Sequence, residues 1–166
     1  RWLKQRPRRV DARGYTYLQP GIEDVVYLNM EFDGGVAVHV HVSWLDPSKV
    51  RRMTVVGSEK MAVYDDASTE AKIQLYDKGI DRRGIDGSLG DFDSFGKFQL
   101  IQRAGDVLLP RIDFSEPLRT ECQHFVDCIA EGKKPLTDGE NGLRVVEALE
   151  AASRSLERGG VSIEID

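Results

Sequence analysis

The sequence has few cysteines and no long apolar run. Its 166 residues include two cysteines, Cys122 and Cys128, whose spacing matches neither a zinc site nor a disulfide framework. Two free thiols are therefore expected, in a reducing compartment. No apolar run approaches the length of about 18 residues that a membrane span needs, and no signal-peptide pattern is visible. These absences predict a cytoplasmic protein without a membrane partner. The first residue, Arg1, favours a fragment or a processed chain.

Signatures of nucleotide binding and of nucleophilic catalysis are also missing. Neither G-x-G-x-x-G nor G-x-x-x-x-G-K-[ST] occurs, since Gly96-Lys97 is followed by Phe98. No strand-turn-helix-strand unit is available to hold a dinucleotide. No G-x-S-x-G motif occurs either, and no Ser or Cys has a convincing base partner. We therefore expect no catalytic residue, no cofactor-binding residue and no bound cofactor in this chain.

The charge of the chain argues against nucleic acid as a partner. The net charge is −5, although six cations lie within the first thirteen residues. This basic segment could touch phosphates, but a solvated connector over residues 1–13 is the favoured interpretation. Residues 77–97 are rich in Gly and Asp and are expected to form a long loop.

The first two-thirds of the chain shows the period-two alternation of β-strands. Residues 24–32 and 36–44 each place large apolar side chains on one face and mostly polar side chains on the other. Further strands are expected over residues 50–56, 60–64, 72–76, 98–102, 107–109 and 161–165.

The turn between the first two strands sets their register. A three-residue loop, Asp33–Gly35, makes all the apolar side chains agree in face, whereas a two-residue loop would mix the faces. The same register places Asn29 beside His39 and Tyr27 beside His41.

The last third changes to helical spacing. One helix is expected to begin near Pro117 and to end at Gly132, and a second is expected to follow a capping box of Thr137 and Glu140 and to end at Gly159. Their apolar stripes are Leu118, Cys122, Phe125 and Ile129 in the first helix, and Val145, Leu149, Ala152 and Leu156 in the second. Strands followed by helices predict an α+β fold: one domain over residues 1–166, with a large, mostly antiparallel open sheet and two C-terminal helices on one face. The other face would meet solvent, another domain or another subunit.

Four residues of the first hairpin are candidates for an interface. His39 and His41 are alternate residues of one strand, so they share a face about 7 Å apart. Two such histidines can bind a metal, but a third ligand would have to come from elsewhere. We therefore assign no metal and expect Tyr27, Asn29, His39 and His41 to lie at an oligomer or domain interface.

Four other residues are candidates for substrate contact. Trp44 is followed by Lys49 and Arg51, and an aromatic ring with cations near by suits a sugar or nucleotide-sugar. The alternative is a connector between two strands that is flanked by charged residues. His124 lies off the apolar stripe of its helix; it is either structural or a contact to a substrate hydroxyl or phosphate.

Several segments together resemble a known family. They are Arg1-Trp2-Leu3, the run from Val42 through Gly57-Ser58 to Asp66, and the closing stretch from Glu121 to Ser155 with Pro135 and Asp138-Gly139. In order and spacing they resemble the C-terminal domain of the Gfo/Idh/MocA family of NAD(P)-dependent oxidoreductases, whose fold is dihydrodipicolinate-reductase-like. The middle run is similar to a subgroup related to nucleotide-sugar 3-dehydrogenases.

This resemblance implies a function that the chain would share with an absent domain. Family members bind NAD or NADP on an N-terminal Rossmann domain that carries a catalytic lysine in E-K-P and a histidine in D-x-G-x-H-x-x-D, and neither motif occurs here. The chain would thus supply substrate binding and homo-oligomerisation through its sheet, to an oxidoreductase acting on a sugar, cyclitol or nucleotide-sugar hydroxyl. Alone it would be inactive. The alternative is a non-enzymatic protein-interaction or dimerisation module that uses the open sheet face.

Overall fold

The computed structural model describes residue 3 and residues 5–79, 105–113 and 115–165. The chain divides into two compact units. Unit 1 combines Arg1–Asp46 with Ser115–Asp166, and unit 2 is Pro47–Phe114. Each unit is described by itself below.

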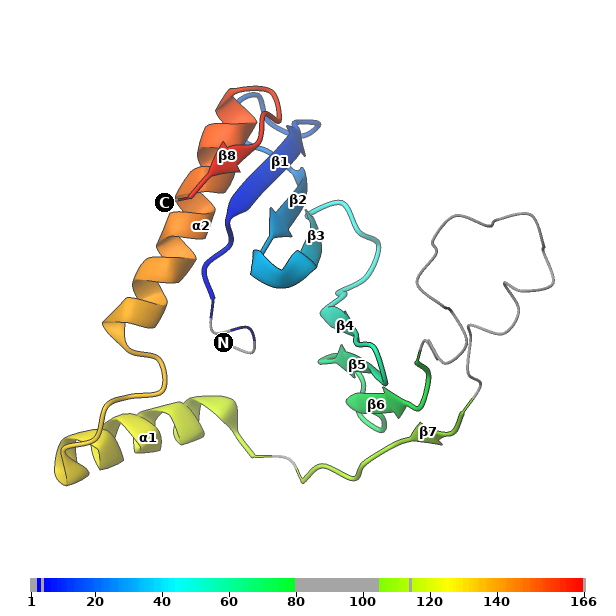
Figure 1. The fold of residues 1–166 in the computed structure, drawn as a ribbon, viewed down its shortest axis with the longest axis vertical. Helices are drawn as coiled ribbons and strands as arrows, with labels where there is room; N and C mark the ends of the chain where they lie inside the picture. The colour runs from blue at the N-terminus through cyan, green and yellow to red at the C-terminus, as the bar shows by residue number, and fades with distance from the viewer. Residues whose placement is uncertain (1–2, 4, 80–104, 114, 166) are drawn as a thin grey trace. The chain divides into compact units, whose positions relative to one another are not determined.

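Unit 1 contains a four-stranded antiparallel sheet built from both ends of the chain. The strand order is β3 (Ala37–Ser43), β2 (Val25–Glu31), β1 (Arg9–Tyr15) and β8 (Ile163–Glu164). Figure 1 shows the N-terminal strand β1 in blue beside the C-terminal strand β8 in red. The last residues of the chain therefore complete a sheet that the first residues begin.

The hairpin of β2 and β3 has the predicted register. Asn29 lies opposite His39, and Tyr27 lies opposite His41. The turn is the short 3-10 segment η1 (Asp33–Gly35), whose two glycines both have φ of 76°. This left-handed conformation is costly for a residue with a Cβ, so the two glycines allow the predicted three-residue loop.

Strand β1 corrects the expected connector over residues 1–13. Residues 9–13 form a strand, because Val10 and Ala12 are fully buried while the side chains between them lie on the other face. Arg9 remains near solvent and pairs with Glu164 at 3.1 Å. The high density of arginine in this segment led to the prediction of a connector, although its apolar and polar residues alternate as in a strand.

Helix α2 (Gly139–Glu157) packs on β1 and β8 and covers one face of this sheet. The core between them consists of Val10, Ala12, Ala151, Ala152 and Ile163. The predicted stripe of α2 is only half right, because Val145 and Leu149 are 53% and 58% exposed. Small residues pack against the sheet instead, which lets the helix approach the strands closely.

Helix α1 (Pro117–Glu131) begins and ends where expected. Pro117 occupies its first position, and Gly132 ends it with a left-handed φ of 64°. Its apolar stripe, however, is exposed, with Phe125 at 61% and Ile129 at 69%. Among the described residues α1 makes no contact with a strand comparable to that of α2.

The start of α2 differs by one residue from the predicted capping box. Asp138, not Thr137, is the N-cap, and its carboxylate accepts the amide N–H of Asn141 at 2.8 Å. Aspartate is among the preferred N-cap residues because its short side chain reaches the free amides of the first turn.

Unit 2 contains a second four-stranded antiparallel sheet, in the order β4 (Arg52–Val56), β5 (Met61–Asp65), β6 (Ile73–Tyr76) and β7 (Val107–Leu108). These strands match four of the predicted ones within about two residues. The predicted strand 98–102 and most of the predicted loop 77–97 lie outside the described residues.

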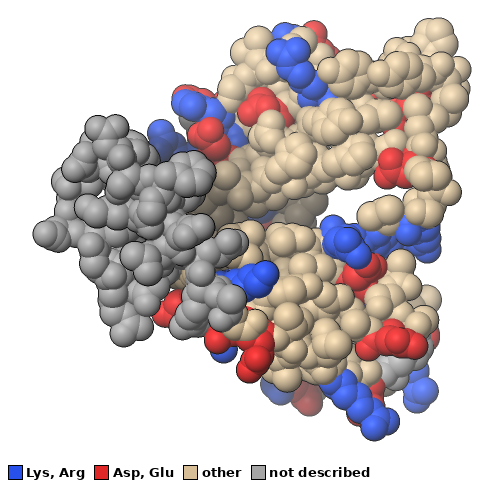
Figure 2. Space-filling model, turned by 90° about the vertical axis from the view of Figure 1, so that its right-hand side faces the viewer, with Lys and Arg blue, Asp and Glu red and all other residues tan. Residues whose placement is uncertain are grey.

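The α+β class and the antiparallel pairing are confirmed. The expected single large sheet is instead two sheets of four strands, with no ladder joining them among the described residues. The pairing of β3 ends at Ser43, and the segment that follows includes Pro47, which has no backbone N–H to donate. Neither described helix is long and apolar enough to cross a membrane. On the side shown in Figure 2, cationic and anionic side chains stand in small groups among uncharged residues.

Candidate functional site

The face of the unit 1 sheet turned away from α2 carries a cluster of polar and aromatic side chains. We call it the open face and define it by Asp11, Tyr15, Tyr27, Asn29, His39 and His41. These residues alternate with the side chains that pack under α2, so strand geometry places them together on the opposite surface. No described helix of unit 1 packs on this face.

Three of these side chains form a hydrogen-bonded chain across three strands. Asn29 Nδ2 donates to Asp11 Oδ2 at 2.8 Å, and His39 Nδ1 lies 2.8 Å from Asn29 Oδ1. The amide oxygen can only accept, so Nδ1 of His39 must carry the proton. In the neutral ring, Nε2 then keeps its lone pair free. These two hydrogen bonds therefore fix both the orientation and the tautomer of His39.

The aromatic rings of the open face stack in a row. The ring of Tyr27 lies 4.8 Å from that of His41 at an interplanar angle of 9°, and 6.3 Å from that of His39 at 20°. Tyr15 meets Tyr27 edge-on at 6.4 Å. Although Tyr27 is 41% exposed, its ring is thus held between neighbours. The four residues predicted to form an interface lie together, with Asp11 and Tyr15 beside them.

Trp44 lies just beyond β3 and is 84% exposed. Its amide N–H donates to the Asp24 carbonyl oxygen at 2.9 Å, beside a hollow of about 310 Å³ lined by Val26 and Val42. The buried carboxylate of Asp24 accepts the amide N–H groups of Tyr17 at 2.5 Å and Leu18 at 2.7 Å. Asp24 therefore orders the loop beside Trp44, a role that the sequence analysis missed.

Lys49 and Arg51 belong to unit 2 and are both exposed. Arg51 lies 3.6 Å from Asp66, which also accepts the Tyr64 hydroxyl at 2.9 Å. That hydrogen bond lowers the pKa of Asp66, with Lys72 and Arg51 adding to the effect, and it raises the pKa of Tyr64. The charge of Arg51 is thus shared with a carboxylate of its own sheet.

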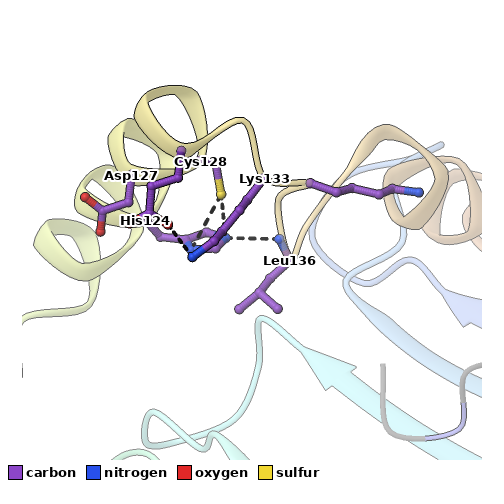
Figure 3. A pocket seen from close by; sticks show the side chains of 7 residues that line it. His124, Asp127, Cys128, Lys133 and Leu136 are labelled. Carbon is purple, nitrogen blue, oxygen red and sulfur yellow. Dashed lines mark hydrogen bonds and ion pairs between the residues drawn. The ribbon is translucent and has the colours of Figure 1, made fainter.

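His124 lies on α1 beside the loop that follows the helix (Figure 3). Its Nε2 accepts the amide N–H of Leu136 at 3.0 Å and lies 3.6 Å from Sγ of Cys128. A hollow of about 480 Å³ is lined by these residues together with Lys133 and Lys134. The hydrogen bond gives His124 a structural role in holding this loop, and its Nδ1 lies 3.9 Å from Sγ of Cys128.

The two cysteines differ in their surroundings. Both are free thiols, as expected, but Cys128 is buried against His124 whereas Cys122 is exposed.

The chain is similar in fold to sugar-related oxidoreductases of known structure. With UDP-N-acetylglucosamine 3-dehydrogenase GnnA from Acidithiobacillus ferrooxidans it shares 18% identity and a TM-score of 0.68, over 93% of this chain and 42% of that one. With aldose-aldose oxidoreductase from Caulobacter crescentus it shares 17% identity and a TM-score of 0.66, over 97% of this chain and 42% of that one. With the WlbA dehydrogenase from Bordetella pertussis, solved with NADH and UDP-GlcNAcA, it shares 19% identity and a TM-score of 0.63, over 99% of this chain and 40% of that one. The chain thus spans less than half the length of these proteins.

Comparison by sequence gives a consistent result for the first part of the chain. No curated protein matches the sequence significantly. Residues 1–63, which include the whole β2–β3 hairpin, match the family model described as the GFO/IDH/MocA C-terminal domain. The predicted resemblance to the C-terminal domain of the Gfo/Idh/MocA family is therefore confirmed, by the family model over residues 1–63 and by the fold over nearly the whole chain.

Proposed function

We propose that this chain is the substrate-binding and oligomerisation portion of an NAD(P)-dependent oxidoreductase that acts on a sugar, cyclitol or nucleotide-sugar hydroxyl. The observation that carries the proposal is the open face, an ordered polar surface on which no described helix of unit 1 packs. Three solved oxidoreductases share the fold and are more than twice as long as this chain. The nicotinamide nucleotide would be held by an N-terminal Rossmann domain, and the chain would contribute no catalytic residue.

The open face supports the oligomerisation role because it is already ordered before any partner binds. The rings of Tyr27 and His41 are stacked, and Asn29 is tied to Asp11, so little side-chain entropy remains to be lost on association. Tyrosine is enriched at interface centres because it buries a large ring and keeps a polar end. We infer that a second copy of the chain covers this surface.

Trp44 is the best supported of the four substrate contacts. Its backbone is anchored by a hydrogen bond to the ordered Asp24 segment, its indole is exposed, and an aromatic ring can cover the apolar face of a sugar. Lys49 and Arg51 are cations that would suit a diphosphate. His124 could contribute its Nδ1–H, since its Nε2 is engaged by Leu136. Each of these assignments is part of the proposal.

Titration calorimetry tests the enzymatic half of the proposal. UDP-N-acetylglucosamine, NAD⁺ and NADP⁺ are titrated separately into the chain and into Trp44→Ala. We expect weak sugar-nucleotide binding that Trp44→Ala abolishes, and no heat with either dinucleotide. Measurable NAD⁺ affinity of the isolated chain would overturn the assignment of nucleotide binding to the Rossmann domain. An absence of sugar-nucleotide binding would favour the alternative, a protein-interaction module.

Sedimentation velocity in EDTA tests the oligomerisation half. We expect a dimer that Tyr27→Arg weakens about tenfold or more, because it places a cation in the centre of the interface. Glu150→Arg is the matched control: it introduces the same side chain at an exposed position of α2 and should leave association unchanged. A strict monomer at the highest attainable concentration would refute the self-association.

A further inference from the structure

The two histidines of the open face have the character of metal ligands. We propose that His39 and His41 form one half of a transition-metal site, which the same two histidines of a second copy complete. The proposal rests on the self-association proposed above, and it adds a ligand that would regulate it. It concerns Zn²⁺ and chemically similar ions such as Co²⁺, because imidazole nitrogen favours these over Mg²⁺ or Ca²⁺.

His39 is prepared as a ligand by the chain of hydrogen bonds that ends on it. A carboxylate can only accept, so Asp11 turns the NH₂ group of Asn29 toward itself and leaves the amide oxygen for His39. The proton of the imidazole is thereby held on Nδ1, and the lone pair stays on Nε2. Metal-binding histidines characteristically donate their second N–H to such a partner, which orients the ring and raises its basicity.

His41 supplies the second nitrogen from the same strand. It is two residues from His39, so both side chains project from one face with about 7 Å between their Cα atoms. Its ring is stacked on Tyr27 at 4.8 Å, which limits its rotation. Both histidines are exposed, so neither nitrogen has to break a buried contact to reach an ion.

Among the described residues of one chain, the pair has no third ligand. No group of three His, Cys, Asp or Glu side chains able to hold a metal occurs among residues 5–79, 105–113 and 115–165. Zn²⁺ prefers four ligands in a tetrahedron. In a two-fold interface the same patch of each subunit faces the other, so a pair near the axis becomes four nitrogens. In this proposal the second copy supplies the remaining ligands, so the ion would strengthen the dimer.

The experiment uses the untagged chain with Cys122→Ser, which removes the exposed thiol as a competing ligand. ZnCl₂ is titrated by calorimetry, CoCl₂ by visible absorption, and mass is followed by sedimentation in EDTA and in Zn²⁺. We expect one ion per two chains, the intense visible bands of tetrahedral Co²⁺, and tighter dimerisation in Zn²⁺. His39→Gln and His41→Gln should each abolish all three effects.

Two further variants separate a metal site from adventitious binding. Asn29→Leu removes the partner of His39 without removing a ligand, and should weaken Zn²⁺ binding about 10- to 100-fold. His124→Gln removes the third histidine, whose Nε2 is already engaged by Leu136, and should leave binding unchanged. Dimerisation in EDTA with no response to Zn²⁺ would overturn the metal site while sparing the interface. Binding of one ion per monomer, or binding that survives His39→Gln, would overturn it as well.

Discussion

The two faces of the unit 1 sheet are made by the same strands but are built on opposite principles. Under α2 the contacts are small and apolar, and Val10 and Ala12 are fully buried. On the open face the corresponding positions hold Asp11, Asn29 and His39, joined by directional hydrogen bonds. One face gains its stability by excluding water, and the other is ordered while still in contact with water.

This difference indicates which face holds the fold together and which is available to a partner. Burial under α2 cannot be exchanged for another surface without unfolding the unit, because α2, β1 and β8 share one core. The open face can be covered or uncovered while the sheet stays intact. Substitutions should therefore affect the free energy of unfolding on one face, and association on the other.

The largest expected effect comes from placing a charge on the core face. Val10→Asp buries a carboxylate without a partner and should lower the free energy of unfolding by about 3–5 kcal/mol. Asp11→Ala, at the next residue and on the open face, should cost no more than about 1 kcal/mol. Urea unfolding followed by circular dichroism measures both. Should Val10→Asp fail to fold, Val10→Ala provides a milder test on the same side. Equal losses for neighbouring residues 10 and 11 would remove the distinction between the faces.

A smaller effect is expected from Ser155, a polar side chain buried between α2 and the sheet. Ser155 is fully buried; its hydroxyl accepts the Ala12 amide at 2.9 Å and donates to the Val161 carbonyl oxygen at 2.7 Å. Ser155→Ala leaves both backbone groups without that partner, which should cost about 1–3 kcal/mol. Ser153→Ala makes the same change on the exposed side of α2 and should stay within about 0.5 kcal/mol. An equal response to the two substitutions would show that the hydroxyl adds nothing.

The hairpin could be predicted from the sequence because local signals agreed with one another. With the Asp33–Gly35 turn, the alternation along both strands allowed one register that puts all the large apolar side chains on one face. That register pairs Asn29 with His39 and Tyr27 with His41, as observed. The packing of α2 could not be predicted in the same way. Hydropathy favoured Leu149, but Ala151 and Ser155 face the sheet because only small side chains allow the close approach. Size, not hydropathy, decided that face.

The candidate site was half predictable for a related reason. Its histidines were found from strand alternation, but the hydrogen-bonded chain that orders His39 depends on Asp11, which lies in the overlooked strand β1. The signal was present, since Val10 and Ala12 alternate with polar residues from Arg9 to Tyr15. The high density of arginine made this segment resemble a solvated connector instead. The contact between Asp11 and Asn29 also requires the pairing of β1 with β2 in its observed register, which no local turn motif specifies.

The smallest effect concerns the start of α2, the helix that covers one of the two faces. Asp138 caps α2, and the nearby Lys134 ammonium together with the Asn141 amide lowers the pKa of its carboxyl below the ordinary value of 3.8. A lowered pKa means that the stabilisation is fully present above the ordinary value and is lost as the pH falls through the lower, folded-state value. The Asn141 amide resonance should therefore shift in that acid range. Asp138→Asn keeps an oxygen that can cap the helix but does not titrate, so the same resonance should stay constant. The acid-range shifts of the β2–β3 hairpin amides should be the same in Asp138→Asn as in the wild type. If Asp138→Asn changed them, α2 and the open face would be coupled, and the independence of the two faces would fail.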